Sequence, residues 1–134
     1  IRSGNQYSAL DRKTVLVVED TSSNYLLISA MLSKHYNLLH AVNGEQAVAM
    51  VKEYKIDLLL MDMKMPVMDG LTATAEIRKF DTNIPIVALT AHAFESDKVA
   101  ALKSGCNDYL VKPVDKARLM SVLRKYCHPS TLIL

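Results

Sequence analysis

The most informative segment of the chain is LLLMDMKMPVMDG, residues 58–70. Its apolar start ends on a carboxylate, Asp62, and the chain then enters a loop that contains Pro66, Asp69 and Gly70. A short apolar run bounded by turn residues is typical of a strand that is buried on both faces. A carboxylate at the end of such a strand lies at the rim of a sheet, where its charge is costly unless it is paired or functional. Taken alone, the segment fits a helix cap or a solvated loop residue equally well.

Short apolar runs and helical segments alternate along the rest of the chain. The runs that we expect to form strands are TVLVV (14–18), NLLHA (37–41), IDLLLM (56–61), IPIVAL (84–89) and DYLV (108–111). Helices are expected after a cap at Ser22 or Ser23, from Gly44, at 71–79, at 96–104 and from about Asp115. This fivefold alternation without a hairpin signal predicts an α/β fold, with a doubly wound five-stranded parallel sheet and helices on both faces.

Some features of the helix ends can also be predicted. Asp69 and Gly70 are best interpreted as a turn with a helix cap. In the helix that follows, Leu71, Ala75 and Arg78 are expected to share one face. Gly105 is expected to end the helix at 96–104, because glycine readily adopts the left-handed conformation of a C-cap.

Chemically active side chains stand where several of the predicted strands end. They are Glu19 and Asp20 after the first strand, Asp62 in the third, Thr90 after the fourth, and Lys112 with Pro113 after the fifth. The second strand ends in Ala41 and contributes nothing to this set. In doubly wound sheets ligands bind outside the carboxyl ends of the strands, and in the strand order 2-1-3-4-5 the first and third strands are neighbours. We therefore expect the three carboxylates to lie close together.

Three clustered carboxylates repel one another, and either protonation or a bound cation can relieve that repulsion. Mg²⁺ suits such a site, because it is typically held by one or two carboxylates together with phosphate oxygens. An acidic pair such as Glu19 and Asp20 is otherwise common at a helix N-terminus. The presence of Asp62, Thr90 and Lys112 at the same edge makes a magnesium site the better interpretation.

Four of these segments carry a family resemblance. VLVVED, LLLMDMKMPVMDG, PIVALTA and DYLVKP resemble, in order and spacing, the motifs of response-regulator receiver domains. The resemblance covers about residues 13–127 and implies a flavodoxin-like receiver fold with strand order 2-1-3-4-5. Residues 1–12 then form a linker or disordered terminus, and residues 128–134 a tail.

The resemblance also implies how the site works. Asp62 would be the phosphoacceptor, which attacks the phosphorus of a phosphohistidine on a kinase or phosphotransfer domain. Asp20, Asp62 and the backbone carbonyl of Lys64 would ligate Mg²⁺, and Glu19 would act through a bound water. The domain would serve as a phosphoacceptor rather than as an enzyme that turns over.

Further residues receive roles from the same resemblance. Lys112 would offset the charge of the transferring phosphoryl group, and the Thr90 hydroxyl would bond one of its oxygens. Pro113 would follow a cis peptide bond. Tyr109 would form a rotamer switch with Thr90, although a half-buried core tyrosine is an equally good interpretation.

Two other function classes share part of this pattern. An aspartyl-phosphate hydrolase acting on small phosphate esters also uses a strand-end aspartate and Mg²⁺. Such enzymes resemble a pattern with a second aspartate two residues after the nucleophile, where this chain has Lys64. A pseudo-receiver that binds partners without phosphorylation usually lacks one of the site residues, and here none is missing.

Composition narrows the remaining possibilities. The chain has 134 residues, of which 50% are apolar, which suits one domain with a sizeable core. A net charge of +2 without a basic run argues against nucleic-acid binding, and no apolar run reaches the length of a membrane span. Cys106 and Cys127 form no metal or disulfide pattern, which favours reduced thiols in the cytoplasm.

The context of the domain is suggested by two further segments. IVALTAHA and GCNDYLVKP look most like receivers carried by hybrid sensor histidine kinases. Together with the start at Ile1, they favour a domain excised from such a kinase, whose parent chain could be membrane-anchored. The oligomeric state is not encoded in any pattern of the sequence.

Overall fold

The computed structural model describes residues 12–128. The strands are β1 (Thr14–Val18), β2 (Asn37–Ala41), β3 (Leu58–Asp62), β4 (Ile86–Thr90) and β5 (Asp108–Val111). The helices are α1 (Ser22–Leu32), α2 (Gly44–Glu53), α3 (Gly70–Arg78), α4 (Glu95–Ser104) and α5 (Lys116–Tyr126). The predicted linker at 1–12 and tail at 128–134 lie outside the described residues, apart from Arg12 and His128.

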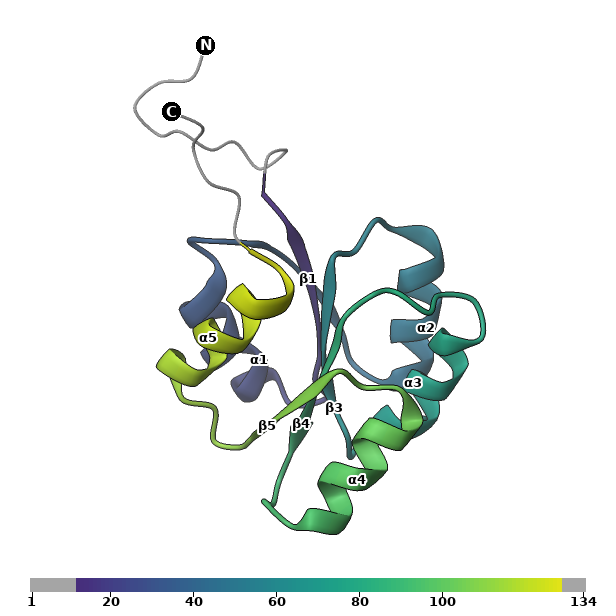
Figure 1. The fold of residues 1–134 in the computed structure, drawn as a ribbon. Coiled ribbons are helices and arrows are strands. Elements are labelled where there is room, and N and C mark those ends of the chain that lie inside the picture. Colours follow the sequence, from purple (N-terminus) through teal and green to yellow (C-terminus); the bar gives the residue numbers. More distant parts are fainter. Residues whose placement is uncertain (1–11, 129–134) are drawn as a thin grey trace.

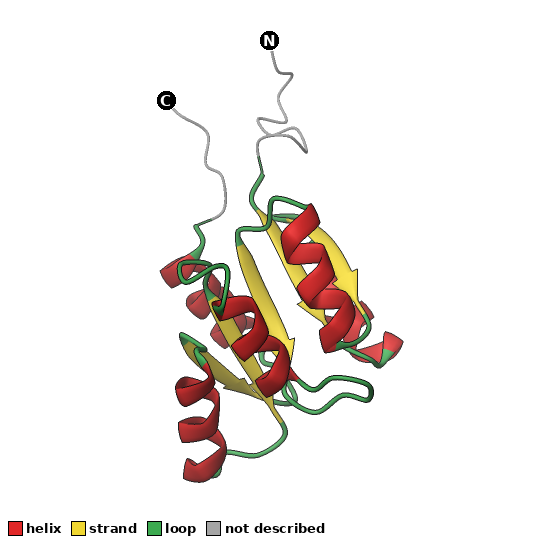
Figure 2. Cartoon of the chain, turned by 90° about the vertical axis from the view of Figure 1, so that its right-hand side faces the viewer, coloured by secondary structure: helices red, strands yellow, loops and turns green. Residues whose placement is uncertain are grey.

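The five strands form one parallel sheet in the order β2-β1-β3-β4-β5. All of them run in the same direction (Figure 2). The predicted fold class and strand order are therefore confirmed. Because β1 and β3 are neighbours, with Val18 opposite Met61, the residues that end these two strands meet at one edge of the sheet.

Helices cover both faces of the sheet, with α1 and α5 on one side and α2, α3 and α4 on the other (Figure 1). Side chains alternate along each strand and so feed two cores. In β1, Val15 and Val17 pack toward α1 and α5, whereas Leu16 and Val18 pack toward the other three helices. Every residue of β3 is buried, which explains its continuous apolar sequence and places Asp62 at the edge of the interior.

Most of the predicted helix ends are present. Asp69 and Asp115 cap α3 and α5 through their side chains, and Asn43 caps α2 in the same way. Gly105 ends α4 with φ +116°, a conformation that glycine adopts without steric cost. Within residues 12–128 no helix combines the length and apolar character needed to cross a membrane.

One helix prediction was wrong. Neither Ser22 nor Ser23 caps α1, because the N-cap position is Thr21 and its side chain makes no capping bond. The face of α3 that carries Leu71, Ala75 and Arg78 is not its buried face, since the buried residues of this helix are Gly70, Ala73, Thr74 and Ile77. Arg78 instead extends toward the end of α4, where its Nε donates to the Gly105 carbonyl at 2.9 Å.

The loop between β3 and α3 is tightly constrained. Val67 has φ +70°, and the Met68 amide donates to the Pro66 carbonyl at 2.8 Å, which closes a three-residue turn. A Cβ atom on Gly70 would collide with the backbone carbonyl of Asp62, and one on Gly44 would lie 2.5 Å from the Met68 carbonyl. Gly70 thus allows this loop to pack closely against the end of β3, and Gly44 allows the start of α2 to pack closely against the loop.

Replacing Val67 with asparagine is expected to stabilise the protein by about 1 kcal/mol, because a β-branched residue is strained at positive φ and asparagine tolerates it. The Val67 side chain is 76% exposed, so little packing is lost. Urea unfolding checks this, with Val67→Ala as a control that removes the same methyl groups. An asparagine variant no more stable than the alanine variant would show that the turn stores no such strain.

Candidate functional site

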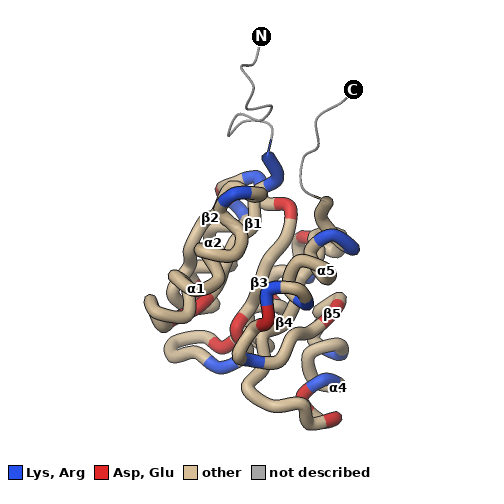
Figure 3. The backbone as a smooth tube through the Cα atoms, turned by 90° about the vertical axis from the view of Figure 1, so that its left-hand side faces the viewer, with Lys and Arg blue, Asp and Glu red and all other residues tan. Residues whose placement is uncertain are grey.

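Three carboxylates gather where β1 and β3 end. Glu19, Asp20 and Asp62 each place an oxygen within 4.8 Å of the others. Glu19 and Asp62 are buried, at 0% and 4% exposure, whereas Asp20 is exposed. In Figure 3 acidic and basic positions meet near the lower end of the sheet. The carboxylate cluster predicted from the strand ends is present in the structure.

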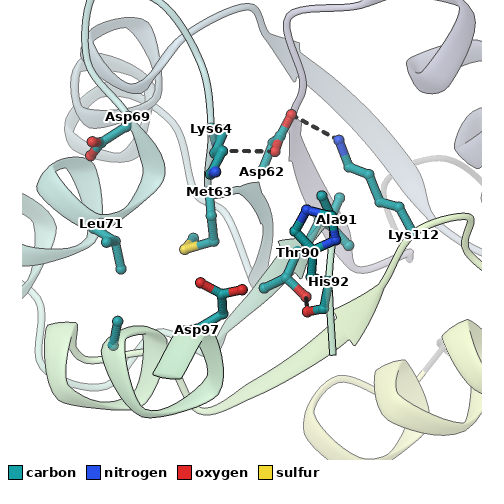
Figure 4. Close-up of a pocket in the computed structure, with 12 residues that line it drawn as sticks. Asp62, Met63, Lys64, Asp69, Leu71, Thr90, Ala91, His92, Asp97 and Lys112 are labelled. Carbon is teal, nitrogen blue, oxygen red and sulfur yellow. Dashed lines mark hydrogen bonds and ion pairs between the residues drawn. The ribbon is translucent and has the colours of Figure 1, made fainter. Parts of the chain in front are cut away.

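Lys112 balances this charge from the end of β5. Its Nζ lies 2.9 Å from Asp62 Oδ2 and 3.1 Å from Glu19 Oε2, and Figure 4 shows the side chain directed at Asp62. The peptide bond between Lys112 and Pro113 is cis. One ammonium group therefore serves two buried carboxylates.

The two oxygens of Glu19 have different surroundings. Oε1 accepts hydrogen bonds from the Thr21 amide at 3.3 Å and from Asn24 Nδ2 at 3.4 Å. Oε2 is buried and has no hydrogen bond of good geometry among the described residues, so its contact with Lys112 is an ion pair only. Glu19 thus keeps one oxygen free to accept a second positive partner.

The surroundings of the site shift the pKa values of one acidic and one basic side chain, Glu19 and Lys112. Burial raises the pKa of Glu19, and the negative charge of Asp62 raises it further against the opposing effect of Lys112. For Lys112, burial lowers the pKa, but the contacts with Asp62 and Glu19 outweigh burial and the pKa is raised. The ammonium group is therefore held firmly in its charged form.

The donor set fits a hard divalent cation. Two negative charges about 5 Å apart repel by roughly 3 kcal/mol at an effective dielectric of 20, and a single ammonium cannot neutralise three carboxylates. Oε2 of Glu19, which accepts no hydrogen bond from the described residues, and the exposed Asp20 offer oxygen atoms, the donors that Mg²⁺ prefers. The Lys64 amide donates to Asp62 Oδ1 at 3.1 Å, so the Lys64 backbone also adjoins the cluster.

Thr90 and Tyr109 make no hydrogen bond to the three carboxylates among the described residues, although Thr90 lines the same cavity as Asp62 and Lys112. The Thr90 hydroxyl has two carbonyl oxygens within reach of its single proton, that of His92 at 3.1 Å and that of Leu110 at 3.4 Å. Within residues 12–128 no hydrogen bond joins it to Asp62. Tyr109 is half-buried against the core beside α3 and α4, and Lys98 Nζ lies 5.0 Å from its ring centre. The structure thus joins Glu19, Asp20, Asp62 and Lys112 in one charged cluster and places Thr90 in the wall of the adjoining cavity, whereas Tyr109 does not line that cavity.

A cavity of about 220 Å³ opens beside Asp62 (Figure 4). It lies between the ends of β3 and β4 and helix α4, and its polar lining includes Lys64, His92, Asp97 and Lys112. His92 is exposed. Asp97 was missed by the sequence reasoning, because an acidic residue in the first turn of a helix carries no distinctive signal.

Comparison with known proteins agrees with this geometry. Residues 15–124 match the family model of the response regulator receiver domain. The chain is 40% identical over 119 residues to hybrid signal transduction histidine kinase M of Dictyostelium discoideum, which covers 83% of this chain and 5% of that protein. It is 42% identical over 118 residues to the sensor histidine kinase GacS of Pseudomonas protegens, covering 84% of this chain and 13% of GacS. The chain thus spans only a small part of these relatives.

Solved structures give the same assignment. The receiver domain of sensor histidine kinase PA1611 from Pseudomonas aeruginosa, which has a magnesium ion in its active-site cleft, superposes with a TM-score of 0.80 at 39% identity, covering 85% of this chain and 96% of that one. The Saccharomyces cerevisiae receiver domain of Ssk1 in complex with the phosphotransfer protein Ypd1 gives 0.82 at 36% identity, covering 87% and 89%. The chain belongs to the response regulator receiver domain family of two-component systems.

Proposed function

We propose that Asp62 accepts a phosphoryl group from a phosphohistidine in a Mg²⁺-dependent reaction and that this modification changes how the domain binds its partners. The observation that carries the proposal is the cluster of three carboxylates within 4.8 Å, with Lys112 Nζ 2.9 Å from Asp62. Such a cluster needs a cation, and the cavity beside Asp62 leaves room for a phosphoryl group.

The reaction requires positioning and charge neutralisation more than covalent chemistry by the protein. An Asp62 oxygen attacks phosphorus while the phosphorus–nitrogen bond of the phosphohistidine breaks. The electron pair of that bond goes to the imidazole nitrogen, which takes up a proton from solvent. A bound Mg²⁺ would neutralise charge on the phosphoryl oxygens. Lys112 can pair with the same oxygens from its present place beside Asp62.

The metal would be held by residues that already adjoin one another. Asp20 and Asp62 would supply carboxylate ligands, and the backbone carbonyl of Lys64 would complete the set contributed by the protein. Glu19 would act through a bound water, for which its Oε2 is suited because it accepts no hydrogen bond from the described residues. A divalent ion in this position relieves the repulsion that Lys112 alone leaves uncompensated.

The donor is a histidine kinase or a phosphotransfer domain. Support comes from the similarity to the two histidine kinases and from the Ssk1 receiver, which is seen bound to a phosphotransfer protein. By the same similarity, the parent chain is a hybrid histidine kinase and the domain works in the cytoplasm. The buried free thiols Cys106 and Cys127 are compatible with that compartment. No nucleic-acid or membrane contact is assigned to this domain.

Transfer from a phosphorylated phosphotransfer protein tests the proposal. The domain is expected to take up the phosphoryl group when Mg²⁺ is present and to lose this ability when the ion is chelated. Transfer that proceeds equally well in excess chelator would contradict the role of the carboxylate cluster. Steady release of phosphate from small esters by the domain alone would instead indicate a hydrolase.

Thr90 and Tyr109 form the switch that reads the modification. At rest the Thr90 hydroxyl lies 3.1 Å from the His92 carbonyl and 3.4 Å from the carbonyl of Leu110, which follows Tyr109 directly in β5. Turning the hydroxyl toward a phosphoryl oxygen breaks these contacts and frees space beside the tyrosine. Because phosphorylation adds charge at one point, such a bistable contact is needed to carry its effect to another surface.

Beryllofluoride, which mimics a phosphoryl group on aspartate, is expected to shift the NMR signals of Tyr109 and of α4 as well as those of the Asp62 loop. Thr90→Val, which keeps the side-chain shape and removes the hydroxyl, is expected to confine the shifts to that loop. Shifts in the wild-type protein that stop at the Asp62 loop would rule out the switch.

A further inference from the structure

His40 contacts the carboxylate site from β2, the strand to which the sequence assigned nothing. Its Nε2 lies 2.8 Å from the backbone carbonyl oxygen of Glu19. A carbonyl oxygen can only accept a hydrogen bond, so the ring must donate from Nε2. His40 is thus bonded to the main chain of one of the three clustered acidic residues.

The imidazole ring is held in place from its other side. Tyr25 in α1 stacks on it with 3.9 Å between ring centres and an angle of 6° between their planes. Both side chains are half-buried, so the stacked pair is only partly open to solvent. The stack fixes the plane of the imidazole and links β2 to the first helix.

The hydrogen bond from His40 takes the place of a backbone hydrogen bond that the sheet does not provide for the Glu19 carbonyl. The Glu19 amide donates to the Ala41 carbonyl at 3.0 Å, which continues the pairing of β1 with β2 one residue beyond Val18. The chain then turns toward α2, which begins at Gly44, and no backbone amide of β2 remains for the Glu19 carbonyl. The His40 side chain supplies that donor, so both polar groups of the Glu19 backbone are tied to β2.

We infer that His40 is a positioning residue for the cation site. Together with the Thr21 and Asn24 contacts to Oε1, its bond leaves Glu19 Oε2 without a hydrogen bond from residues 12–128 and with the Lys112 ammonium as its ion-pair partner. It also fixes the start of the segment that carries Asp20. The inference rests on the proposed function, because it concerns the divalent cation that this function requires.

Loss of the bond should weaken cation binding without preventing folding. Residues that orient metal ligands typically contribute 10- to 100-fold to affinity, and we expect about 10-fold here because His40 holds a backbone rather than a ligand atom. A role through charge alone would have the opposite sign, since removing a positive ring near three carboxylates would strengthen cation binding. The direction of the change therefore separates the two roles.

Titrations with Mg²⁺, monitored through the NMR signals of the backbone amides of residues 61–64, test the inference. His40→Gln retains a donor at about the reach of Nε2 and is expected to bind within about 2-fold of the wild-type protein, whereas His40→Leu and the shorter His40→Asn should bind about 10-fold more weakly. His35→Leu removes an exposed histidine of the loop before β2 and serves as the matched control, with unchanged affinity.

The outcomes separate the inference from the proposed function. Equal affinity in the wild-type, His40→Leu and His40→Asn proteins would overturn the role of His40 and leave the proposed function standing. Stronger binding by His40→Leu would overturn it as well, in favour of a charge effect. No Mg²⁺ binding by the wild-type protein would overturn both. Faster amide exchange at Asp20 and Thr21 in His40→Leu, but not in His40→Gln, is the accompanying structural result that we expect.

Discussion

Replacing Asp62 with asparagine is expected to abolish phosphoryl acceptance. The amide has no anionic oxygen to attack phosphorus, and it removes one of the carboxylates that would hold the cation. The fold should persist, because the substitution is nearly isosteric and relieves the repulsion between Asp62 and Glu19, while Lys112 keeps Glu19 as its partner. Transfer from a phosphorylated phosphotransfer protein, followed by gel electrophoresis under native conditions, measures the loss.

The matched control for this substitution lies at the end of the loop that follows β3. Asp69→Asn makes the same chemical change seven residues later, where the side chain caps α3 by accepting from the Thr72 amide at 2.8 Å. Asparagine caps a helix as well as aspartate does, so this variant should accept the phosphoryl group normally. An Asp62→Asn protein that accepts as much label as the Asp69→Asn protein would show that the acceptor is another residue.

Replacing Lys112 with alanine is expected to slow phosphoryl transfer to Asp62 by about 100-fold, the usual effect of removing one group that stabilises developing charge. The variant should fold, but its melting temperature should fall, because Glu19 and Asp62 lose the ammonium between them. Adding Mg²⁺ should restore more of this stability than it adds to the wild-type protein, since the cation then acts on uncompensated carboxylates. Rapid-quench transfer kinetics and thermal unfolding with and without Mg²⁺ measure these effects.

Lys125→Ala provides the comparison for Lys112. Lys125 also faces an aspartate, but its Nζ is 3.9 Å from Asp108 and its side chain is 66% exposed. An exposed pair of this kind contributes little, so stability should change by less than about 0.5 kcal/mol and transfer should be unaffected. If the Lys112 variant behaved like the Lys125 variant in both measurements, Lys112 would have no role beyond that of a surface lysine.

The sequence was sufficient for the fold and for the composition of the carboxylate cluster. Continuous apolar strands that alternate with helices allow few arrangements of the chain. In a parallel sheet the carboxyl ends of all the strands lie at the same edge. Glu19, Asp20, Asp62 and Lys112 follow from that rule alone, since each stands where a strand ends. Topology rather than side-chain detail determines that these residues meet.

Features that depend on side-chain direction could not be predicted in the same way. Thr90 also ends a strand, yet its hydroxyl points to backbone carbonyls and not to the carboxylates. The cap expected from Ser22 or Ser23 is absent, and the Thr21 amide bonds the Glu19 carboxylate instead. A position at the end of a strand indicates which edge a residue occupies, but its rotamer and its partner depend on neighbours distant in sequence.

His40 is the clearest residue missed by this reasoning. It stands inside a strand, one residue before the end, and its distance along the sequence from the other histidines is not that of metal ligands. Its contact with Glu19 arises because β2 lies beside β1 and because Tyr25 fixes the ring from the first helix. The contact depends on the relative positions of β1, β2 and α1, and no local sequence pattern predicts these positions.

The most direct measurement is to locate the phosphoryl group in the chain. Borohydride reduction converts an aspartyl phosphate to homoserine, and mass spectrometry of the digested protein then identifies the position. After transfer in the presence of Mg²⁺, we expect homoserine at residue 62 and at no other position. Homoserine at residue 20, or a phosphoryl group found on a histidine or serine while Asp62 stays unmodified, would contradict the assignment of Asp62 as the acceptor.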